Sequence, residues 1–446
     1  MIRVGKPVRR LAIGQPFAAS AASRLNWSTA MLAFGVGLSA LCYPATAATL
    51  CVNPTGSSGC QKTISAAVAA ASPHDTISVA AGTYSESVTI GKPLSLIGGN
   101  ASKTIIDATG LGNAIYVDGI DNPGLANVFI SGFTAQNANF EGILVANASA
   151  VTISGNIVLN NDKKIDFSGA EPACPGIPDF ETGENFDCGE GIHLTGVDHS
   201  TVANNTLHGN AGGILVTDDT GAAHDNLISG NLVSDNPFDC GITLASHPPA
   251  AVAGSKTALG VYNNRVTGNQ SLRNGAMGDG AGVGIFTSAP GTANYGNVVS
   301  NNTMSGNSIP GVSIHGHAPG QNLNNNIIIG NTINSNGADS GDTPTPGPAG
   351  INVAGISPVS GLIIAQNTIS QQAFDVVLNI PGEVDVQRNT FTGGIGILNL
   401  GRGTVNADGN YWGCGTDPSS LMGVFAGCAP TSGNVPVHFF LTAAPQ

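Results

Sequence analysis

Short apolar strands recur along most of the chain, and each begins with a glycine. The run Gly-apolar-x-apolar carries Ile or Val in its second position and Val, Leu or Ile in its fourth. It opens at Gly142, Gly191, Gly213, Gly241, Gly282, Gly311 and Gly350. Because side chains alternate along a strand, the second and fourth residues face one side and the third faces the other. The pattern predicts many short strands and almost no helix after residue 72.

Asparagine forms a second repeat at the ends of these strands. Its members are Asn156, Asn205, Asn231, Asn269, Asn302, Asn331, Asn367, Asn389 and Asn410. A further asparagine follows six of them at a distance of five residues, at Asn161, Asn210, Asn236, Asn274, Asn307 and Asn336. The shortest spacing, 21 residues, fits one coil of three short strands, and longer spacings fit coils with inserted loops. Two columns at a fixed offset predict a solenoid with two internal asparagine ladders.

Two segments resemble a known superfamily. The first lies in residues 62–99 and includes Thr63-Ile64, a run of alanines, Asp75-Thr76-Ile77, Ala81-Gly82-Thr83-Tyr84, Glu86 and Leu96-Ile97-Gly98-Gly99. It resembles the opening coil of right-handed parallel β-helix proteins of the pectin-lyase-like superfamily. The second, Gly409-Asn410-Tyr411-Trp412-Gly413, resembles the last coil of many bacterial members, including periplasmic proteins of the NosD type.

The resemblance extends over residues 50–440 and implies an all-β fold. The expected architecture is a single right-handed parallel β-helix, a solenoid of about a dozen three-strand coils. An alanine-rich helix at about residues 61–72 would cap its N-terminal end, where a strand edge would otherwise be exposed. Repeats of the carbohydrate-binding and sugar-hydrolysis type are implied. The resemblance does not imply any single reaction, because the fold hosts lyases, hydrolases, esterases, epimerases, adhesins and metal-related accessory proteins.

Residues 1–47 have the pattern of an export signal. Basic residues precede an apolar run over about residues 30–42, and Ala45-Thr46-Ala47 follows as a cleavage site. The run is shorter than the ~20 residues that a membrane-spanning helix needs. We expect a signal peptide at 1–47, an N-terminal cap with the first coils at 48–105, and β-helix repeats at 106–440. The mature chain would be a secreted or periplasmic monomer with no membrane span.

Charge narrows the range of partners. The 446 residues include 15 Lys and Arg against 28 Asp and Glu, and loss of the five cations in residues 1–47 leaves a net charge of −18. This balance argues against nucleic acid as a partner. A polyanionic substrate would need a local cation or a bound metal to offset the field.

Six of the seven cysteines that remain after export form sequence-near pairs. The pairs are Cys51 with Cys60, Cys174 with Cys188, and Cys414 with Cys428. Exported chains tolerate disulfides, so we expect three disulfide-closed loops, with Cys240 left over and buried. The middle pair lies in an insertion over residues 162–190 that would either wall one side of a binding cleft or cover a coil.

Histidines and aspartates align in the middle of the predicted solenoid. Counted from the opening glycine, the seventh position of four consecutive coils is Asp219, His247, Ser288 and His317. Neighbouring positions add Asp218, His315, His193 and His224. Equivalent positions of successive coils lie ~4.8 Å apart, so we expect these side chains to converge on one outer face.

Imidazoles beside carboxylates suit acid and base catalysis on a sugar, because histidine titrates near neutral pH and a carboxylate orients it. The predicted catalytic residues are Asp218, Asp219, His247, His315 and His317. The predicted substrate-binding residues are His193, His224, Arg265 and Arg273, the arginines as candidates to neutralise a substrate carboxylate. The same constellation would suit a divalent metal, with calcium as the cofactor that a lyase or epimerase reaction would use. A solvated polar strip is the structural alternative.

Two short elements resemble those of polygalacturonase-type hydrolases. Thr217-Asp218-Asp219 is similar to their double-Asp element, and His315-Gly316-His317 to their Gly-His element. The Asn-Thr-Asp and Arg-x-Lys elements of that family have no counterpart in this sequence. The activity is therefore not transferred.

These observations favour a secreted or periplasmic protein that binds a polysaccharide along residues 190–320, with cleavage or epimerisation as the reactions its site would support. Two alternatives stay open. One is a non-catalytic surface adhesin or structural β-helix. The other, which the closing coil suggests, is a NosD-like periplasmic accessory role in the maturation of a metal enzyme.

Overall fold

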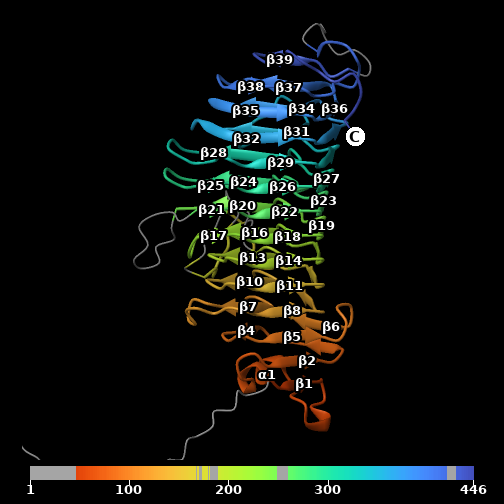
Figure 1. Ribbon diagram of the computed structural model, residues 1–446. Coiled ribbons are helices and arrows are strands. Elements are labelled where there is room, and N and C mark those ends of the chain that lie inside the picture. The colour runs from red at the N-terminus through yellow and green to blue at the C-terminus, as the bar shows by residue number, and fades with distance from the viewer. Residues whose placement is uncertain are drawn as a thin grey trace, which may run out of the picture. The chain divides into compact units, whose positions relative to one another are not determined.

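The computed structural model describes residues 47–166, 168–169, 173–178, 180, 189–248, 260–418 and 428–445. In these ranges the chain winds into a single right-handed parallel β-helix, so the predicted all-β fold is confirmed. Its coils stack one on another from β1 and α1 to β39 (Figure 1). A typical coil gives one strand to each of three long parallel sheets.

The strands described here are short, as the alternating runs predict. The 13-stranded sheet contains β1 (Thr49–Val52), β2 (Thr76–Val79), β5 (Ser95–Gly98), β8 (Phe129–Ser131), β11 (Thr152–Ser154), β14 (Thr201–Ala203), β18 (Leu227–Ser229), β22 (Arg265–Thr267), β26 (Val298–Ser300), β29 (Ile327–Ile329), β32 (Val359–Ala365), β35 (Gly382–Gln387) and β38 (Thr404–Asn406). The 12-stranded sheet contains β4 (Val88–Ile90), β7 (Ile115–Asp118), β10 (Ile143–Ala146), β13 (Ile192–Thr195), β16 (Ile214–Thr217), β20 (Ile242–Ser246), β24 (Val283–Thr287), β28 (Val312–Gly316), β31 (Ala349–Ala354), β34 (Phe374–Asn379), β37 (Ile395–Asn399) and β39 (Thr431–Gly433).

Two further sheets complete the described strands. The 11-stranded sheet contains β3 (Gly82–Tyr84), β6 (Thr104–Asp107), β9 (Thr134–Gln136), β12 (Ile157–Leu159), β15 (Thr206–His208), β19 (Leu232–Ser234), β23 (Gln270–Leu272), β27 (Thr303–Ser305), β30 (Thr332–Asn334), β33 (Thr368–Ser370) and β36 (Thr390–Thr392). A small three-stranded sheet contains β17 (Ala223–His224), β21 (Val261–Tyr262) and β25 (Asn294–Tyr295).

The apolar core runs along the inside of the coils. Ile143 and Val145, the second and fourth residues of their run, are fully buried in it, and the corresponding residues of the later runs join the same cluster. Steric contacts explain why a glycine opens each run. A Cβ atom on Gly311 would lie 2.5 Å from Cγ2 of Ile333 and 2.8 Å from Nδ2 of Asn336. Only glycine lets the core and the asparagine ladder approach the backbone this closely.

Both predicted asparagine ladders are present. In the first, Oδ1 of Asn302 accepts hydrogen bonds from the backbone N–H (2.9 Å) and Nδ2 (3.0 Å) of Asn269. The amide of Asn302 in turn donates to Oδ1 of Asn331 (3.0 Å) and to the carbonyl of Val266 (2.9 Å). Each side chain thereby satisfies buried polar groups of its neighbouring coils.

A third ladder was not predicted. It consists of Asn226, Asn264, Asn297 and Asn326, whose Nδ2-to-Oδ1 distances are 3.0, 3.1 and 3.2 Å. Each member lies five residues before a member of the first ladder, so the same offset in the opposite direction would have revealed it.

The predicted cap is helix α1 (Ile64–Ala70), which lies within the expected range and packs against β1, β2 and β4. Oγ1 of Thr63 accepts the Ala66 N–H at 3.1 Å. The carboxylate of Glu86 accepts the N–H groups of the first two helical residues at 2.8 and 2.9 Å. These bonds satisfy donors that a helix start leaves without intrahelical partners.

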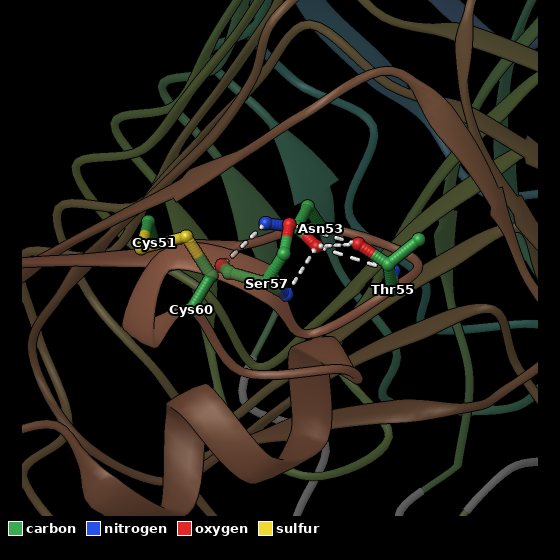
Figure 2. Close-up of a disulfide and its surroundings, with 5 residues drawn as sticks. All are labelled: Cys51, Asn53, Thr55, Ser57 and Cys60. Carbon is green, nitrogen blue, oxygen red and sulfur yellow. Dashed lines mark hydrogen bonds between the residues drawn. A yellow bond between two sulfur atoms is a disulfide. The ribbon is translucent and has the colours of Figure 1, made fainter.

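Two of the predicted disulfides are formed, Cys51–Cys60 and Cys414–Cys428. Figure 2 shows the first beside the short 3₁₀ helix η1 (Ser57–Gly59), where Oδ1 of Asn53 accepts the N–H groups of Thr55 and Ser57, each at 3.1 Å. Cys174 is also disulfide-bonded, and its predicted partner Cys188 lies outside the described residues. Cys240 is buried and free, as expected.

The expected signal peptide lies outside the described residues, apart from Ala47. Within the described ranges, no helix has the length and apolar character needed to cross a membrane. Trp412 of the closing coil is fully buried and packs against Phe391, so it belongs to the C-terminal core.

Candidate functional site

Four neighbouring strands of the 12-stranded sheet position the predicted site. In β16, β20, β24 and β28 the residues that lie in register are Thr217, Ala245, Phe286 and His315. Two positions later come Asp219, His247, Ser288 and His317. The strand pairing therefore agrees with the column counted from the opening glycines.

A cavity of about 440 Å³ lies where these strands end. Its charged and titratable lining consists of His247, His315, His317, Asp239, Asp279, Asp339 and Asp342. Phe286 and Ile309 add apolar surface. Three of the predicted catalytic residues, all of them histidines, thus line one cavity.

Asp219 and His247 form a buried pair at this cavity. Oδ1 of Asp219 lies 3.1 Å from Nδ1 of His247. Burial opposes ionisation of Asp219, but the hydrogen bond with His247 and the charges of His247 and His193 outweigh it, so the pKa lies below its ordinary value. An ionised carboxylate at Nδ1 orients the imidazole and increases its basicity, which is the arrangement of a histidine that accepts a proton.

Asp218 has a different environment from its neighbour. Its carboxylate accepts the N–H groups of His247 (2.8 Å) and Gly260 (2.7 Å) and the hydroxyl of Ser246 (2.9 Å). Burial raises its pKa in spite of these bonds. It does not belong to the cavity lining. These contacts fix the chain that follows β20, so we place Asp218 among the positioning residues instead of the catalytic ones.

His315 and His317 converge on Asp342. Their Nε2 atoms lie 2.7 and 3.3 Å from the same oxygen, Oδ2 of Asp342. Phe286 stacks on His315, with ring centroids 4.2 Å apart. Burial opposes ionisation of Asp342, but the hydrogen bond with His315 and the charges of both histidines hold its pKa below the ordinary value. Among the described residues, these three are the group whose ligand atoms, within 4.8 Å of one another, have the spacing of a metal site.

Asp279 and Asp339 complete the acidic wall. Asp339 is buried, and its carboxylate accepts the N–H groups of Gly341 (3.0 Å), Asp342 (3.1 Å) and Thr343 (3.0 Å), which fixes the loop after β30. Asp279 lies at the rim. Desolvation, followed by the negative charges of Asp339 and Asp342, raises its pKa. The cavity thus contains one carboxyl group with a raised pKa, Asp279, beside one with a lowered pKa, Asp342.

The predicted substrate-binding histidines lie outside the cavity. His193 is buried, with Nε2 3.0 Å from Oγ1 of Thr217 and Nδ1 3.6 Å from Oε1 of Glu141. His224 belongs to the small sheet, where its ring stacks on Tyr262 with a centroid distance of 4.8 Å. The sequence predicts His224 beside the column, but the residue belongs to β17, and the stacking interaction holds its ring there.

The predicted arginines also lie elsewhere. Arg265 is exposed on β22 of the 13-stranded sheet. Arg273 follows β23 and makes two 2.8 Å contacts with the exposed carboxylate of Asp235. Neither lines the cavity, and its described lining contains no Lys or Arg. Both arginines belong to the same coil as the predicted site, but the other two sheets of that coil carry them.

The sequence prediction missed the four cavity aspartates. Asp339 and Asp342 lie in an insertion that makes the Asn331-to-Asn367 spacing 36 residues. Asp239 precedes the glycine that opens the β20 run by two residues. A long insertion directly after the coil with His315 and His317 was the available signal, because insertions in solenoids gather on one face.

Comparison with known proteins agrees with this architecture. The model of a family described as "Protein of unknown function (DUF1565)" matches residues 52–288, more than half of the chain. No protein of curated function matches the sequence.

Solved structures are similar to this chain at low sequence identity, and the first of the following has a TM-score above 0.5. DFA-IIIase from Arthrobacter chlorophenolicus A6 in complex with GF2 aligns at 15% identity and a TM-score of 0.51, over 80% of this chain and 88% of its own. Alginate lyase from Paenibacillus sp. str. FPU-7 aligns at 14% identity and a TM-score of 0.40, over 80% of this chain and 97% of its own. The mannuronan C-5 epimerase AlgE4 A-module from Azotobacter vinelandii aligns at 13% identity and a TM-score of 0.34, over 83% of this chain and 91% of its own.

Proposed function

This chain belongs to the family described as a protein of unknown function (DUF1565), and from that premise we propose that it is an exported enzyme that binds a glycan and hydrolyses it in the cavity of the 12-stranded sheet. The observation that carries the proposal is a buried His247–Asp219 pair at a cavity that also contains Asp279. A base and an acid with different environments are what glycosidic hydrolysis requires.

Each group has a role that follows from its surroundings. His247 accepts a proton from the attacking water, and Asp219 holds the imidazole in position and stabilises its charge. Asp279, whose pKa is raised, donates a proton to the oxygen of the leaving sugar. Phe286 offers an apolar ring surface in the same cavity, which suits the carbon face of a sugar.

The charge of the cavity favours an uncharged glycan over a uronate. Its described lining contains four aspartates and no Lys or Arg. The negative field of these aspartates would repel a uronate polymer, because no cationic side chain of the described lining offsets it. Removal of the proton next to a substrate carboxylate also needs such a cation. On the charges of the protein's own side chains, hydrolysis of a neutral glycan is therefore a better fit than β-elimination or epimerisation.

Export is supported by the covalent structure. The Cys51–Cys60 and Cys414–Cys428 disulfides are typical of a protein that matures in an oxidising compartment. We propose that residues 1–47 direct the chain to the periplasm or the exterior, where glycan substrates occur.

The test is a screen of the purified mature chain against neutral and uronate glycans, with reducing ends and absorbance near 232 nm followed together. We expect reducing ends from a neutral glycan without unsaturated product. His247→Gln and Asp279→Asn should each lower kcat/KM by about 10²- to 10⁴-fold. His199→Gln, an exposed histidine that does not line the cavity, is the matched control and should keep full activity.

The pH profile tests the role of Asp279. The activity should decline as pH rises through the raised pKa of Asp279, because the carboxyl group then loses the proton that it donates. Asp279→Asn should remove this decline from the residual activity. Unsaturated products would instead establish elimination, and the absence of any product on all glycans would contradict the enzymatic proposal in favour of a binding protein.

A further inference from the structure

We propose that His315, His317 and Asp342 form a binding site for a divalent transition metal ion such as Zn²⁺. The inference does not rest on the proposed glycan hydrolysis. It starts from the convergence of two imidazole nitrogens on one carboxylate oxygen, at 2.7 and 3.3 Å. Each of the three residues contributes one ligand atom, and these atoms lie within 4.8 Å of one another.

The protein holds the other nitrogen of His315 in a way that suits a ligand. Nδ1 lies 3.4 Å from Oγ1 of Thr343 and 3.3 Å from Oγ of Ser313. The Thr343 hydroxyl donates its own hydrogen to Oδ2 of Asp339 at 2.8 Å, so its oxygen is an acceptor toward Nδ1. A proton on Nδ1 leaves the lone pair on Nε2, the atom that faces Asp342. Such hydrogen bonds fix the tautomer and ring orientation of metal-binding histidines.

Nε2 of His315 and Nε2 of His317 both face Oδ2 of Asp342, at 2.7 and 3.3 Å. Imidazole nitrogens and carboxylate oxygens are both metal ligands, so one divalent ion would be bound by all three groups at once.

The surrounding charge favours the cation. Asp239, Asp279 and Asp339 line the same cavity, and the described lining supplies no Lys or Arg to balance them. The positive field of an ion would reduce their mutual repulsion. These aspartates do not need to contact the ion to have this effect.

The site is built on elements that are held in place without a metal. His315 lies on β28, paired with β24 and β31 on either side, and its ring stacks on Phe286. Asp342 follows Asp339, whose carboxylate accepts the backbone N–H of Asp342 itself. Preorganised ligands lose less conformational freedom on binding.

The donor set selects the class of metal. Two imidazoles and one carboxylate are the ligands that zinc, copper and nickel prefer, whereas calcium and magnesium prefer oxygen ligands alone. Three protein ligands also leave a coordination position for water or another small ligand. The sequence left the cofactor open, with calcium as one candidate, and this donor set favours a different class of metal.

Titration calorimetry with ZnCl₂ on the EDTA-dialysed mature protein tests the inference, with no glycan present. We expect one equivalent of Zn²⁺ to bind, and the affinity to fall at least 100-fold in the double variant His315→Ala/His317→Ala and in Asp342→Asn. Thr343→Val, which removes only the hydroxyl behind His315, should weaken binding about 10-fold. Co²⁺ as a spectroscopic probe should show visible absorption bands that the double variant loses.

Two controls separate this site from other effects. His199→Ala and His224→Ala remove histidines that do not line the cavity and should bind Zn²⁺ as the natural chain does. His247→Gln, which should strongly reduce glycan hydrolysis, should retain the metal. Failure of the two proposals is therefore distinguishable, because each has its own variants and its own measurement.

The outcomes that overturn the inference are equally specific. Absence of Zn²⁺ binding in the natural chain would show that the three residues form an ion pair only. Unchanged binding in the double histidine variant would place the metal elsewhere. Displacement of Zn²⁺ by equimolar Ca²⁺ would contradict the proposed donor set. Circular dichroism of each variant confirms that loss of binding does not reflect unfolding.

Discussion

Asn269 illustrates how a single ladder residue stabilises the coils on both sides of it. Its Oδ1 accepts the N–H and the side-chain amide of Asn231, each at 2.9 Å, and its own Nδ2 donates to Asn302 and to the carbonyl of Ile228, each at 3.0 Å. All of these groups are buried. Removing the side chain leaves buried donors and acceptors without partners.

We expect Asn269→Ala to lower the free energy of unfolding by about 3 kcal/mol, since each unsatisfied buried polar group costs ~1–3 kcal/mol. Urea denaturation followed by circular dichroism measures the change. The neighbouring Gln270→Ala is the control, because Gln270 is exposed, and it should change stability by less than about 0.5 kcal/mol. Equal effects of the two substitutions would contradict the structural role of the ladder.

Asp375 is a buried acid outside the functional site. It lies on β34, which pairs with β31 of the preceding coil, and its Oδ2 accepts the Gly393 N–H at 3.0 Å. Burial raises its pKa well above the ordinary value, although the hydrogen bond from Gly393 acts to lower that pKa. The folded protein therefore binds a proton at this group more tightly than the unfolded chain does.

This sign of the shift predicts a pH-dependent loss of stability. Stability from Asp375 is present below the unfolded pKa of ~3.9 and is lost as pH rises through the higher folded pKa. Asp375→Asn keeps the group neutral, so we expect the variant to unfold at higher urea than the natural chain at pH 7, with the difference vanishing near pH 3. The control is Asp121→Asn, at an exposed aspartate, which should have the same pH dependence of stability as the natural chain. If Asp375→Asn also had the same pH dependence as the natural chain, the role given to Asp375 would be wrong.

At the scale of elements, α1 protects the end of the solenoid. Ile64, Ala67 and Val68 are buried, whereas Ala66 and Ala69 are exposed. The helix thus presents its apolar face to β1, β2 and β4. Its opposite face, which carries small alanine side chains, faces water. Solenoid ends need such a cover, because an open coil exposes strand edges and core.

Val68→Lys should detach this cap, because it places a charge in the apolar contact. We expect a loss of about 2–4 kcal/mol of stability and the appearance of oligomers, as uncovered ends associate. Size-exclusion chromatography with light scattering measures the mass. Ala69→Lys introduces the same side chain on the exposed face and should stay at the mass of the natural chain, so association of both variants would refute the capping role.

The small sheet explains why His224 was misplaced. β17, β21 and β25 stack the rings of His224, Tyr262 and Tyr295, with centroids 4.8 and 5.1 Å apart. The sequence prediction counted His224 among the neighbours of the catalytic column. Ring stacking between residues of different coils depends on their spatial alignment, and two-residue strands are too short to produce an alternating pattern.

At the scale of the whole solenoid, the three ladders overlap over only part of the chain. The third extends from Asn226 to Asn326, within the range of the other two, while the closing coils retain the first ladder alone, which ends at Asn410. Because each coil contacts only its neighbours, stability follows the local number of ladders.

Hydrogen exchange should reveal this gradient. We expect the backbone amides of residues 226–248 and 260–336 to exchange at least 10-fold more slowly than those of residues 395–416, where fewer buried side-chain bonds connect the coils. Mass spectrometry of peptic fragments gives the rates for both segments in one sample. Uniform rates, or greater protection in the closing coils, would contradict a ladder-determined gradient.

The sequence by itself determined the coils. Opening glycines, alternating apolar residues and two asparagine columns each reflect a contact that repeats in every coil, so the periodic pattern identified the strands, the core and the alignment of Asp219, His247 and His317. The cap was also predictable, because its alanine-rich segment directly precedes the first coil.

Only the tertiary structure decided which polar residues share a cavity. Asp239, Asp279, Asp339 and Asp342 come from segments between strands, and Arg265 and Arg273 belong to the coil of the site but lie on its other two sheets. The repeat specifies how far each coil rises. The path of each inserted loop depends instead on particular bonds, such as those that the Asp339 carboxylate accepts, and no periodicity in the sequence encodes them.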